Sequence, residues 1–443
     1  MQKAAAQTPL VRPLPSPDHV TPYDRLVWQD GQVERLLASG ERREDLETYF
    51  GTSEYRELAR LARRAERAPL ARDVPRVVIV PGIMGSQLGL PRRQPLPRDV
   101  LWLDPLDISS GRLLALKVSE SSAVCSYGVV LYSYLKLKLQ LRAAGFECVF
   151  HAYDWRLGVE PLGKELARRL QAENAPTLAV VAHSMGALVS RAALSLGGGE
   201  RVRRLVLLGA PNFGSFGAVQ ALRGTYAVVR KIARVDAYHS AEALAAEVFT
   251  SFPSLYQMLP AAGYSGALDL FDPSAWPAVG PQPQRELLRA ARHGGAALAA
   301  PDERFTVVVG VGQETVTAVH RRRGDFIYTV TRHGDGTVPV ACARLPGARH
   351  YYAAVAHSEL TRDGRVASAV VELLRAGRTR RLAESWRTAS RAQAQISDAA
   401  LRRTHTEKVD WTALEPEQRR LFLQNLNEPP QLRLRIPGRA ERL

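Results

Sequence analysis

The sequence has few cysteines, no long apolar run and too few acidic residues to balance its basic ones. Cys125, Cys148 and Cys342 lack metal-ligand spacing and are too few for a disulfide framework, so they argue against a zinc site and indicate a reducing compartment. No stretch of about 18 uncharged apolar residues occurs, and prolines interrupt the N-terminus before a hydrophobic segment forms. We therefore predict no transmembrane helix and no signal peptide, and expect a cytoplasmic protein.

The charge balance leaves two interpretations open. Lys and Arg number 60 against 44 Asp and Glu, a net charge of +16, and nearly all of the excess is arginine. Aromatic residues make up 7% of the chain and do not alternate with basic blocks, so nucleic-acid binding is not predicted. The excess is then either a solvated basic surface or a surface for peripheral contact with an anionic membrane. The 46% hydrophobic content is ordinary for a globular protein with a substantial core.

The chain divides into three parts by composition. Residues 1–75 form an arm, which is proline-rich and extended through residue 40 and then contains a helix capped by Ser53. Residues 76–375 alternate between predicted strands and helices, and residues 376–443 are predicted to be a basic helical tail packed on the outside. A central catalytic domain with two appendages is therefore expected.

The middle part predicts an α/β fold with a mostly parallel central sheet flanked by helices. Short apolar runs with helical patterns between them are typical of right-handed βαβ units. The alternation lapses at 87–130 and at 212–303, and two such insertions at one end of a sheet would form a lid and a cap. The predicted strands are 77–80, 148–152, 178–182, 205–208, 305–311 and 326–331.

A candidate nucleophile lies where one of these strands turns into a helix. Ser184 follows the apolar run 178–182 in the segment AHSMG and precedes a helical pattern. A nucleophile elbow needs small residues two positions before and after the serine, because larger side chains would strike the adjoining strand and helix. Ala182 and Gly186 meet this requirement, although the first is usually glycine. We therefore predict that Ser184 is the nucleophile.

A serine hydroxyl needs a histidine base, which should follow it in this fold class. Only three histidines follow a plausible acid loop: His350, His357 and His405. His350 lies inside a predicted strand, whereas His357 follows that strand in a loop before a helix. His357 is therefore the predicted base. No metal or cofactor is implied by this chemistry.

The acid of the triad should lie between the serine and the histidine in the chain. Asp335 lies in the segment HGDGTVP, directly after the predicted strand 326–331, where a short loop can present its carboxylate at the sheet edge. Asp302 and Asp325 precede strands and would face the other edge. Asp335 is therefore the predicted acid.

Acyl transfer also needs backbone N–H donors for the oxyanion. One should come from Met185, directly after the nucleophile, and another from the turn PGIMGS at 81–86. Ile83 is the nearer candidate in that turn and Met84 is the alternative.

Taken together, these motifs resemble the lecithin:cholesterol acyltransferase family of α/β-hydrolases, which includes phospholipases and acyltransferases. The resemblance spans most of residues 76–375 and maps the family triad onto Ser184, Asp335 and His357. It implies that Trp102 contacts substrate and that residues 214–301 cap the acyl chain. Residues 153–155 directly follow a predicted strand, far before the serine turn, so we interpret them as a structural corner. The matching segments are VVIVPGIMGSQL at 77–88, VLWLDP at 100–105, AYDWR at 152–156, AHSMGALVSR at 182–191, LGAPNFGS at 208–215 and GDGTVP at 334–339.

The sequence thus predicts serine-dependent hydrolysis of a carboxylic ester, and the resemblance points to a lipid ester, as in a lipase, phospholipase or esterase. Two alternatives remain. An O-acyltransferase would use the same triad and pass the acyl group to an alcohol, because the acceptor depends on water exclusion. A catalytically silent hydrolase scaffold would instead bind an anionic partner through its basic arm and tail.

Overall fold

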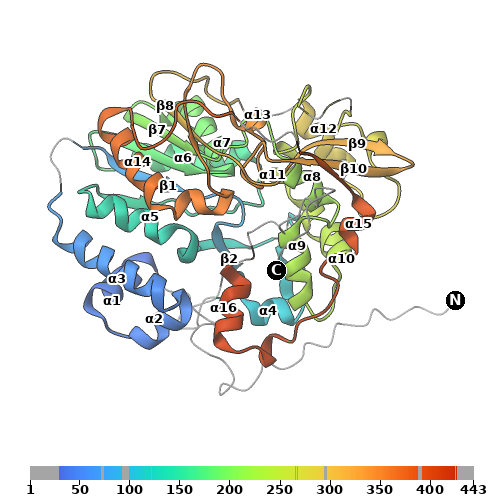
Figure 1. Ribbon diagram of the computed structural model, residues 1–443, viewed down its shortest axis with the longest axis horizontal. Coiled ribbons are helices and arrows are strands. Elements are labelled where there is room, and N and C mark those ends of the chain that lie inside the picture. Colours follow the sequence, from blue (N-terminus) through green and yellow to red (C-terminus); the bar gives the residue numbers. More distant parts are fainter. Residues whose placement is uncertain are drawn as a thin grey trace.

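A parallel sheet forms the centre of the molecule (Figure 1). The computed structural model describes residues 29–70, 74–91, 99–120, 122–264, 266, 268–293, 297–387, 392–424 and 426. Within these residues the central sheet has six strands, and each paired strand runs parallel to its neighbour. In spatial order they are β11 Arg349–Ala353, β8 Phe305–Gly310, β7 Val202–Leu208, β6 Leu178–His183, β1 Arg76–Val80 and β5 Cys148–Phe150.

Helices cover both faces of this sheet. Successive side chains of a strand point to opposite faces, so Val77 and Ile79 of β1 belong to one core while Val78 and Val80 belong to the other. All four are almost fully buried, as in strands of a parallel sheet covered on both sides. The predicted α/β class and mostly parallel sheet are therefore confirmed. One face carries α5 Leu131–Ala143 and α14 Gly364–Ala376, and the other carries α6 Val159–Ala172 and α7 Met185–Ala193.

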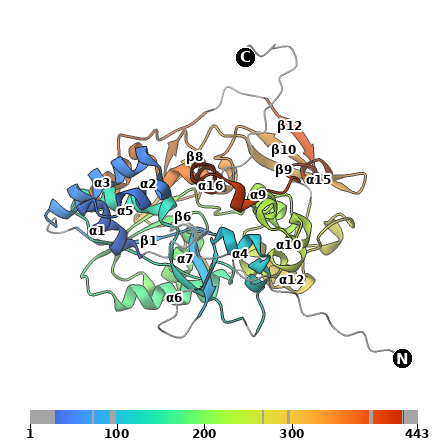
Figure 2. The same ribbon diagram turned by 90° about the horizontal axis from the view of Figure 1, so that it is seen from below.

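Two insertions leave the sheet from the carboxyl ends of β1 and β7. They contact each other, since the Val118 N–H donates to Ser251 Oγ at 2.9 Å and the Ala237 N–H donates to the Ser109 carbonyl at 3.3 Å. Both views show α4 beside α9 and α10 (Figures 1 and 2). The first insertion contains β2 Ser86–Leu90, β3 Asp99–Trp102, α4 Pro105–Ser109 and β4 Cys125–Val129; the second contains α8 Phe216–Leu222, α9 Ala227–Val235, α10 Ala241–Glu247, α11 Pro253–Gln257 and α12 Arg285–His293.

The prediction that residues 326–331 form a strand of the central sheet is wrong. They belong to β10 (Asp325–Thr331), which pairs antiparallel with β9 (Thr315–Arg322) and β12 (Ala394–Ser397) in a separate sheet. The physical reason is visible along β10, where buried and half-buried side chains alternate strictly. This pattern is typical of a strand with one covered face, whereas the central strand β8 is buried throughout.

The chain before β1 forms three helices. α3 (Thr52–Arg67) agrees with the predicted helix, but α1 (Asp30–Ser39) and α2 (Arg43–Phe50) lie where an extended lead through residue 40 was expected. Apolar residues of these helices, such as Leu37 and Leu58, are buried in a common core with the outer face of α5. Tertiary packing therefore stabilises short helices that their local sequence does not mark. The proline-rich residues 1–28 lie outside the described part.

The segment after α14 is part of the fold, which corrects the prediction of an outer helical tail. It contributes β12, α15 (Asp398–Arg402) and α16 (Pro416–Gln424). The short helix α13 (Val340–Ala343) lies earlier in the chain, before β11. Asp398 is fully buried, accepts from Arg223 Nε at 3.0 Å and accepts from the Tyr328 hydroxyl at 2.9 Å. A buried carboxylate needs such partners, so these bonds attach the segment to the cap and to β10. Residues 427–443 are not described.

Candidate active site

Ser184 occupies a sharp turn between β6 and α7. Its backbone has φ +53° and ψ −128°, a region that residues with a Cβ rarely adopt, and this exposes the hydroxyl above the carboxyl edge of the sheet. The turn also brings α7 against the end of β1, where a Cβ added to Gly186 would lie 2.3 Å from the Pro81 carbonyl oxygen. The small residue at position 186 is therefore required by close backbone approach, as the sequence pattern indicates.

The structure brings Ser184, His357 and Asp335 into one hydrogen-bonded line. His357 Nε2 lies 2.9 Å from Ser184 Oγ, and His357 Nδ1 lies 2.7 Å from Asp335 Oδ2. An ionised carboxylate can only accept, so Nδ1 carries a proton and Nε2 is free to accept from the serine hydroxyl. All three side chains are buried. The imidazole is therefore held in the tautomer that can take a proton from Ser184.

Asp335 reaches this line by a route that the sequence does not show. Its loop folds back against the end of β8, where a Cβ on Gly310 would meet the Asp335 Cβ at 2.5 Å. Asp335 Oδ1 accepts from the N–H groups of Thr337 and Val338 at 2.9 and 2.7 Å, and the His357 N–H donates to the Asp335 carbonyl at 2.8 Å. These bonds orient the carboxylate and fix its loop to the loop of the histidine.

The turn after β1 lies directly against the serine. A Cβ on Gly82 would lie 2.8 Å from the Ser184 Cβ, so only glycine fits there. Ile83 and Met84 line the pocket beside Ser184. In the described part of the chain, no hydrogen bond occupies the N–H groups of Ile83, Met84 or Met185. Their role as oxyanion donors, including the choice between Ile83 and Met84, stays a prediction.

A buried hydrogen-bond relay joins the two sides of the site, and the sequence pattern does not predict it. Tyr134 Oη accepts from the Gly82 N–H at 2.9 Å and lies 3.0 Å from His183 Nδ1. His183 Nε2 lies 3.0 Å from the His357 carbonyl oxygen, which can only accept. Nε2 of His183 must then carry the proton, and Nδ1 accepts from the tyrosine hydroxyl. The relay runs from the oxyanion turn to the histidine loop.

His183 is neutral in this relay. Burial lowers the pKa of His183 to about 3, and the neighbouring His357 adds to this lowering. A neutral ring has one donor and one acceptor nitrogen, which is what the two bonds require. The signal available in the sequence is the histidine directly before the serine in AHSMG, but nothing there indicates Tyr134 or the carbonyl of residue 357.

Trp102, which the resemblance implies contacts substrate, lies behind the oxyanion turn instead. Its side chain is 1% exposed, its Nε1 donates to the Met84 carbonyl at 2.9 Å, and its ring packs edge-on against Trp155 at 5.3 Å between centroids. Trp155 Nε1 in turn donates to the Ser86 carbonyl at 3.0 Å. Both tryptophans therefore hold the backbone of the turn, and Trp102 does not line the pocket at Ser184.

The pocket at Ser184 is narrow and apolar. Its cavity volume is about 40 Å³, well below the roughly 300–1,000 Å³ of typical small-molecule sites. Residues of α8 and α11 in the cap cover it, and Thr337 and Val338, in the loop that carries Asp335, form another part of its wall. Its lining comprises Ile83, Met84, Ser184, Pro211, Ser215, Gly217, Ala218, Ala221, Tyr226, Leu255, Met258, Thr337 and Val338.

Other chemistry-bearing side chains do not gather at this site. Cys148 and Cys342 are buried, and burial raises the pKa of each thiol to about 12, so neither is a thiolate nucleophile near neutral pH. Across the described residues, no cluster of three or more histidine, cysteine, aspartate or glutamate side chains could hold a metal ion. In the same residues, none of the helices combines the length and apolarity needed to span a bilayer.

Comparisons with known proteins find similar solved structures but no similar sequence. No family model and no curated protein sequence matches the chain significantly. Among solved structures, the mature lipase BlEst2 of Bacillus licheniformis is 15% identical, with 70% of this chain and 94% of that chain covered and a TM-score of 0.37. A chain of the Tle4–Tli4 complex is 13% identical, with 69% and 99% covered and a TM-score of 0.41. These likenesses concern the fold alone. The sheet order and the strand–serine–helix turn described above are those of an α/β-hydrolase fold.

Proposed function

We propose that this protein is a serine hydrolase that cleaves carboxylic esters through an acyl-enzyme on Ser184. The observation that carries the proposal is the hydrogen-bonded line of Ser184, His357 and Asp335 beside backbone N–H groups that have no partner among the described residues. A nucleophile, its base, the orienting acid and the oxyanion donors are the four parts that acyl transfer needs. A catalytically silent scaffold that only binds a partner would not need all four of these parts together.

In the first half of the reaction, Ser184 Oγ attacks the ester carbonyl carbon while His357 Nε2 takes the hydroxyl proton. Negative charge develops on the carbonyl oxygen, where the N–H of Met185 and that of Ile83 or Met84 would stabilise it. The bond to the leaving alcohol then breaks, and His357 returns the proton to the alcohol oxygen. Asp335 stabilises the imidazolium throughout and keeps Nδ1 protonated.

In the second half, water attacks the acyl carbon. His357 accepts a proton from the water, the bond to Ser184 Oγ breaks, and the histidine returns that proton to the serine. The products are a carboxylic acid and an alcohol, and the enzyme is restored. No group beyond the side chains named here is needed for the proton transfers.

The apolar pocket supports an acyl group as the part of the substrate that enters the site. The cap lines it with the apolar side chains of Ala218, Ala221, Leu255 and Met258, which favour hydrocarbon over charge. A long acyl chain would need the cap to widen, because the cavity is only about 40 Å³. Together with the resemblance to lipases, phospholipases and acyltransferases, these walls support a lipid ester as substrate.

The proposal also includes water as the acceptor of the acyl group and an anionic lipid surface as the place where the protein binds its substrate. Hydrolysis is favoured over transfer to an alcohol because nothing in the sequence marks an acceptor pocket. The net charge of +16 supports peripheral contact with anionic lipid surfaces. Long-chain ester turnover in anionic vesicles should then exceed that in neutral ones at low salt, and near-molar salt should remove the preference.

A fluorophosphonate probe tests the central claim. The parent should be labelled on the peptide that contains Ser184, and Ser184→Ala should lose both the label and turnover of p-nitrophenyl esters, with a fall of about 10⁴-fold or more. Ser39→Ala, at an exposed position on α1, is the matched control and should behave like the parent. Labelling of Ser184→Ala at parental levels would contradict the proposal. Ester products formed when an alcohol is added would indicate an acyltransferase.

A further inference from the structure

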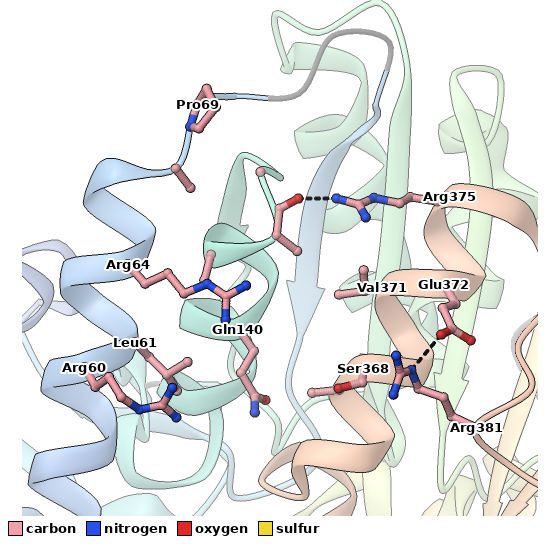
Figure 3. A pocket seen from close by; sticks show the side chains of 15 residues that line it. Arg60, Leu61, Arg64, Pro69, Gln140, Ser368, Val371, Glu372, Arg375 and Arg381 are labelled. Atoms are coloured by element: carbon pink, nitrogen blue, oxygen red, sulfur yellow. Dashed lines mark hydrogen bonds and ion pairs between the residues drawn. The ribbon is translucent and has the colours of Figure 1, made fainter.

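A second cleft lies at the opposite edge of the sheet from Ser184. Its walls are α3 on one side and α14 on the other, with the last turn of α5 between them (Figure 3). The cavity volume is about 670 Å³, within the usual range for small-molecule sites. Since α5 ends just before β5 begins, the cleft opens at the amino ends of the strands. A ligand in it would be separate from the chemistry at Ser184.

Arginine side chains converge on this cleft from both walls. Arg60 and Arg64 lie one turn apart on α3 and extend toward Gln140 of α5, while Arg375 and Arg381 approach from the opposite side (Figure 3). The one acidic residue in the described lining is Glu372. The lining therefore carries a formal excess of three positive charges.

Two of the four arginines have partners inside the protein. Arg375 donates to the Ala144 carbonyl at 2.5 Å, which caps the end of α5, and Arg381 forms an ion pair with Glu372 at 2.6 Å. Arg60 and Arg64 have neither an ion pair nor a side-chain hydrogen bond with any described residue. Their guanidinium groups, with ten N–H donors by composition, are available to a ligand.

A polar group at the centre of the cleft also has no partner. The side-chain oxygen of Gln140 is buried and accepts no hydrogen bond within the described residues. The carboxamide can be turned by 180° without changing its shape, so its N–H₂ end can equally face the cleft. Gln140 therefore offers a neutral hydrogen-bonding group between the two basic walls.

Concavity distinguishes these arginines from the other basic residues of α3. Arg63 and Arg67 are also one turn apart and exposed, but they do not line the cleft. Charges on an open surface are well solvated, whereas charges on facing walls of a cleft add their potentials across a region of low dielectric. The helix dipole favours basic residues in the last turn of α3, which holds both Arg64 and Arg67. The dipole therefore does not explain why Arg64 lines the cleft and Arg67 does not.

We propose that this cleft binds a phosphate-bearing anion with at least two negative charges. Guanidinium groups match phosphate oxygens with paired N–H donors, and the two unpartnered guanidinium groups of Arg60 and Arg64 suit an anion with two charges. The phosphate can belong to a soluble small molecule or to the head group of an anionic lipid. Binding requires neither Ser184 nor an intact triad.

Inorganic pyrophosphate is the probe, titrated into the full-length protein at low salt by calorimetry. The parent and Ser184→Ala should bind it equally, and the Arg60→Gln/Arg64→Gln double variant should bind it at least about tenfold more weakly, since each loses donors to the anion. The Arg63→Gln/Arg67→Gln variant removes the same charge from the same helix and should stay within about twofold of the parent. Glutamine and arginine have similar helix propensities, and circular dichroism should confirm that both variants fold.

Vesicles identify the source of the phosphate. If the phosphate belongs to a lipid head group, vesicles that contain phosphatidic acid should sediment the parent but not the Arg60→Gln/Arg64→Gln variant, and pyrophosphate should compete. If it belongs to a soluble molecule, both proteins should behave alike with these vesicles, while pyrophosphate still distinguishes them. The proposal is overturned if pyrophosphate does not bind the parent, or if both double variants weaken binding equally. The first result would mean that the cleft is not an anion-binding site. The second would mean that pyrophosphate binds to a diffuse basic surface and not to the cleft.

Discussion

Removing the hydroxyl of Tyr134 should damage both stability and turnover, because this one group connects the two halves of the active site. Tyr134→Phe keeps the ring, which is 3% exposed, and removes the atom that accepts from the Gly82 N–H at 2.9 Å and donates to His183 Nδ1 at 3.0 Å. The Gly82 N–H and the His183 ring nitrogen then remain buried without partners. The relay to the His357 carbonyl loses its anchor.

The size of the stability loss follows from those two groups. A buried polar group left without a partner costs about 1–3 kcal/mol, so two that share one hydroxyl should lower the free energy of unfolding by about 2–4 kcal/mol. Domains are commonly stable by about 5–15 kcal/mol, so the variant should still fold. Urea unfolding followed by tryptophan fluorescence measures the change.

Turnover should fall because the oxyanion turn and the histidine loop are no longer tied together. Loss of an oxyanion donor costs about 10²–10³-fold in kcat, and a displaced donor should cost part of that, so we expect a fall of about 10- to 100-fold. KM should change little, since the pocket walls are untouched. A p-nitrophenyl ester assay separates the two constants.

Tyr55→Phe is the matched control for this substitution. Tyr55 is also buried on a helix, but its hydroxyl makes no hydrogen bond with a described residue, so stability should change by less than about 0.5 kcal/mol and kcat should not change. The reasoning is refuted if Tyr134→Phe retains the parental kcat, or if its unfolding free energy matches that of Tyr55→Phe.

Two further predictions concern the acid of the triad and the dependence of stability on pH. Asp335→Asn should keep substrate binding and lower turnover by about 10⁴-fold, because the amide can donate to His357 and select the wrong tautomer; a larger loss in Asp325→Asn would mean that the acid is misassigned. A fall in pH should destabilise the fold. Burial lowers the pKa of His183 to about 3 and that of His151 to about 4. Below their ordinary pKa of 6.5, these histidines therefore bind more protons in the unfolded chain than in the folded protein. The free energy of unfolding should fall from pH 6.5 toward pH 4 by up to about 1.4 kcal/mol per pH unit for each histidine, less steeply in His151→Gln, and a flat profile from pH 7 to 5 would contradict this.

The central sheet and the serine turn could be predicted because their signals are local. A strand buried on both faces is a continuous apolar run, and the turn around Ser184 needs a small residue at position 186 for a reason that acts within a few residues. The chain order of serine, acid and histidine adds a rule of the fold class. Together these features select Ser184, Asp335 and His357, which the structure places within hydrogen-bond distance of one another.

Asp335 lies beside His357, but it reaches this place by another route than the predicted one. The prediction placed β10 in the central sheet, although its alternating burial belongs to an antiparallel sheet with one covered face. The carboxylate reaches the site because its loop folds against Gly310 and bonds to its own backbone. Such long-range placement of a loop is not encoded in the periodicity of the strand before it.

The relay and the outer helices could not be predicted for a related reason. Gly82, Tyr134, His183 and His357 are separated by about 50 residues or more, and no spacing rule connects a helix tyrosine to a loop carbonyl. Helices α1 and α2 are short, and isolated helices of that length are marginal in water. Their stability comes from burial against α5, which only the folded chain provides.

The site separates the parts that perform the chemistry from the parts that select the substrate. Ser184, His357 and Asp335 are held by backbone turns at the sheet edge, whereas much of the pocket wall comes from cap residues between positions 215 and 258. A hydrogen bond from Ser215 Oγ, directly before α8, to the Thr337 carbonyl in the loop of Asp335 links the two parts at 2.7 Å. Because Thr337 also donates its N–H to Asp335, a shift of the cap at Ser215 would be transmitted to the carboxylate. Changes farther along α8 and α11 should therefore alter the size of the acyl group accepted while leaving the triad in place.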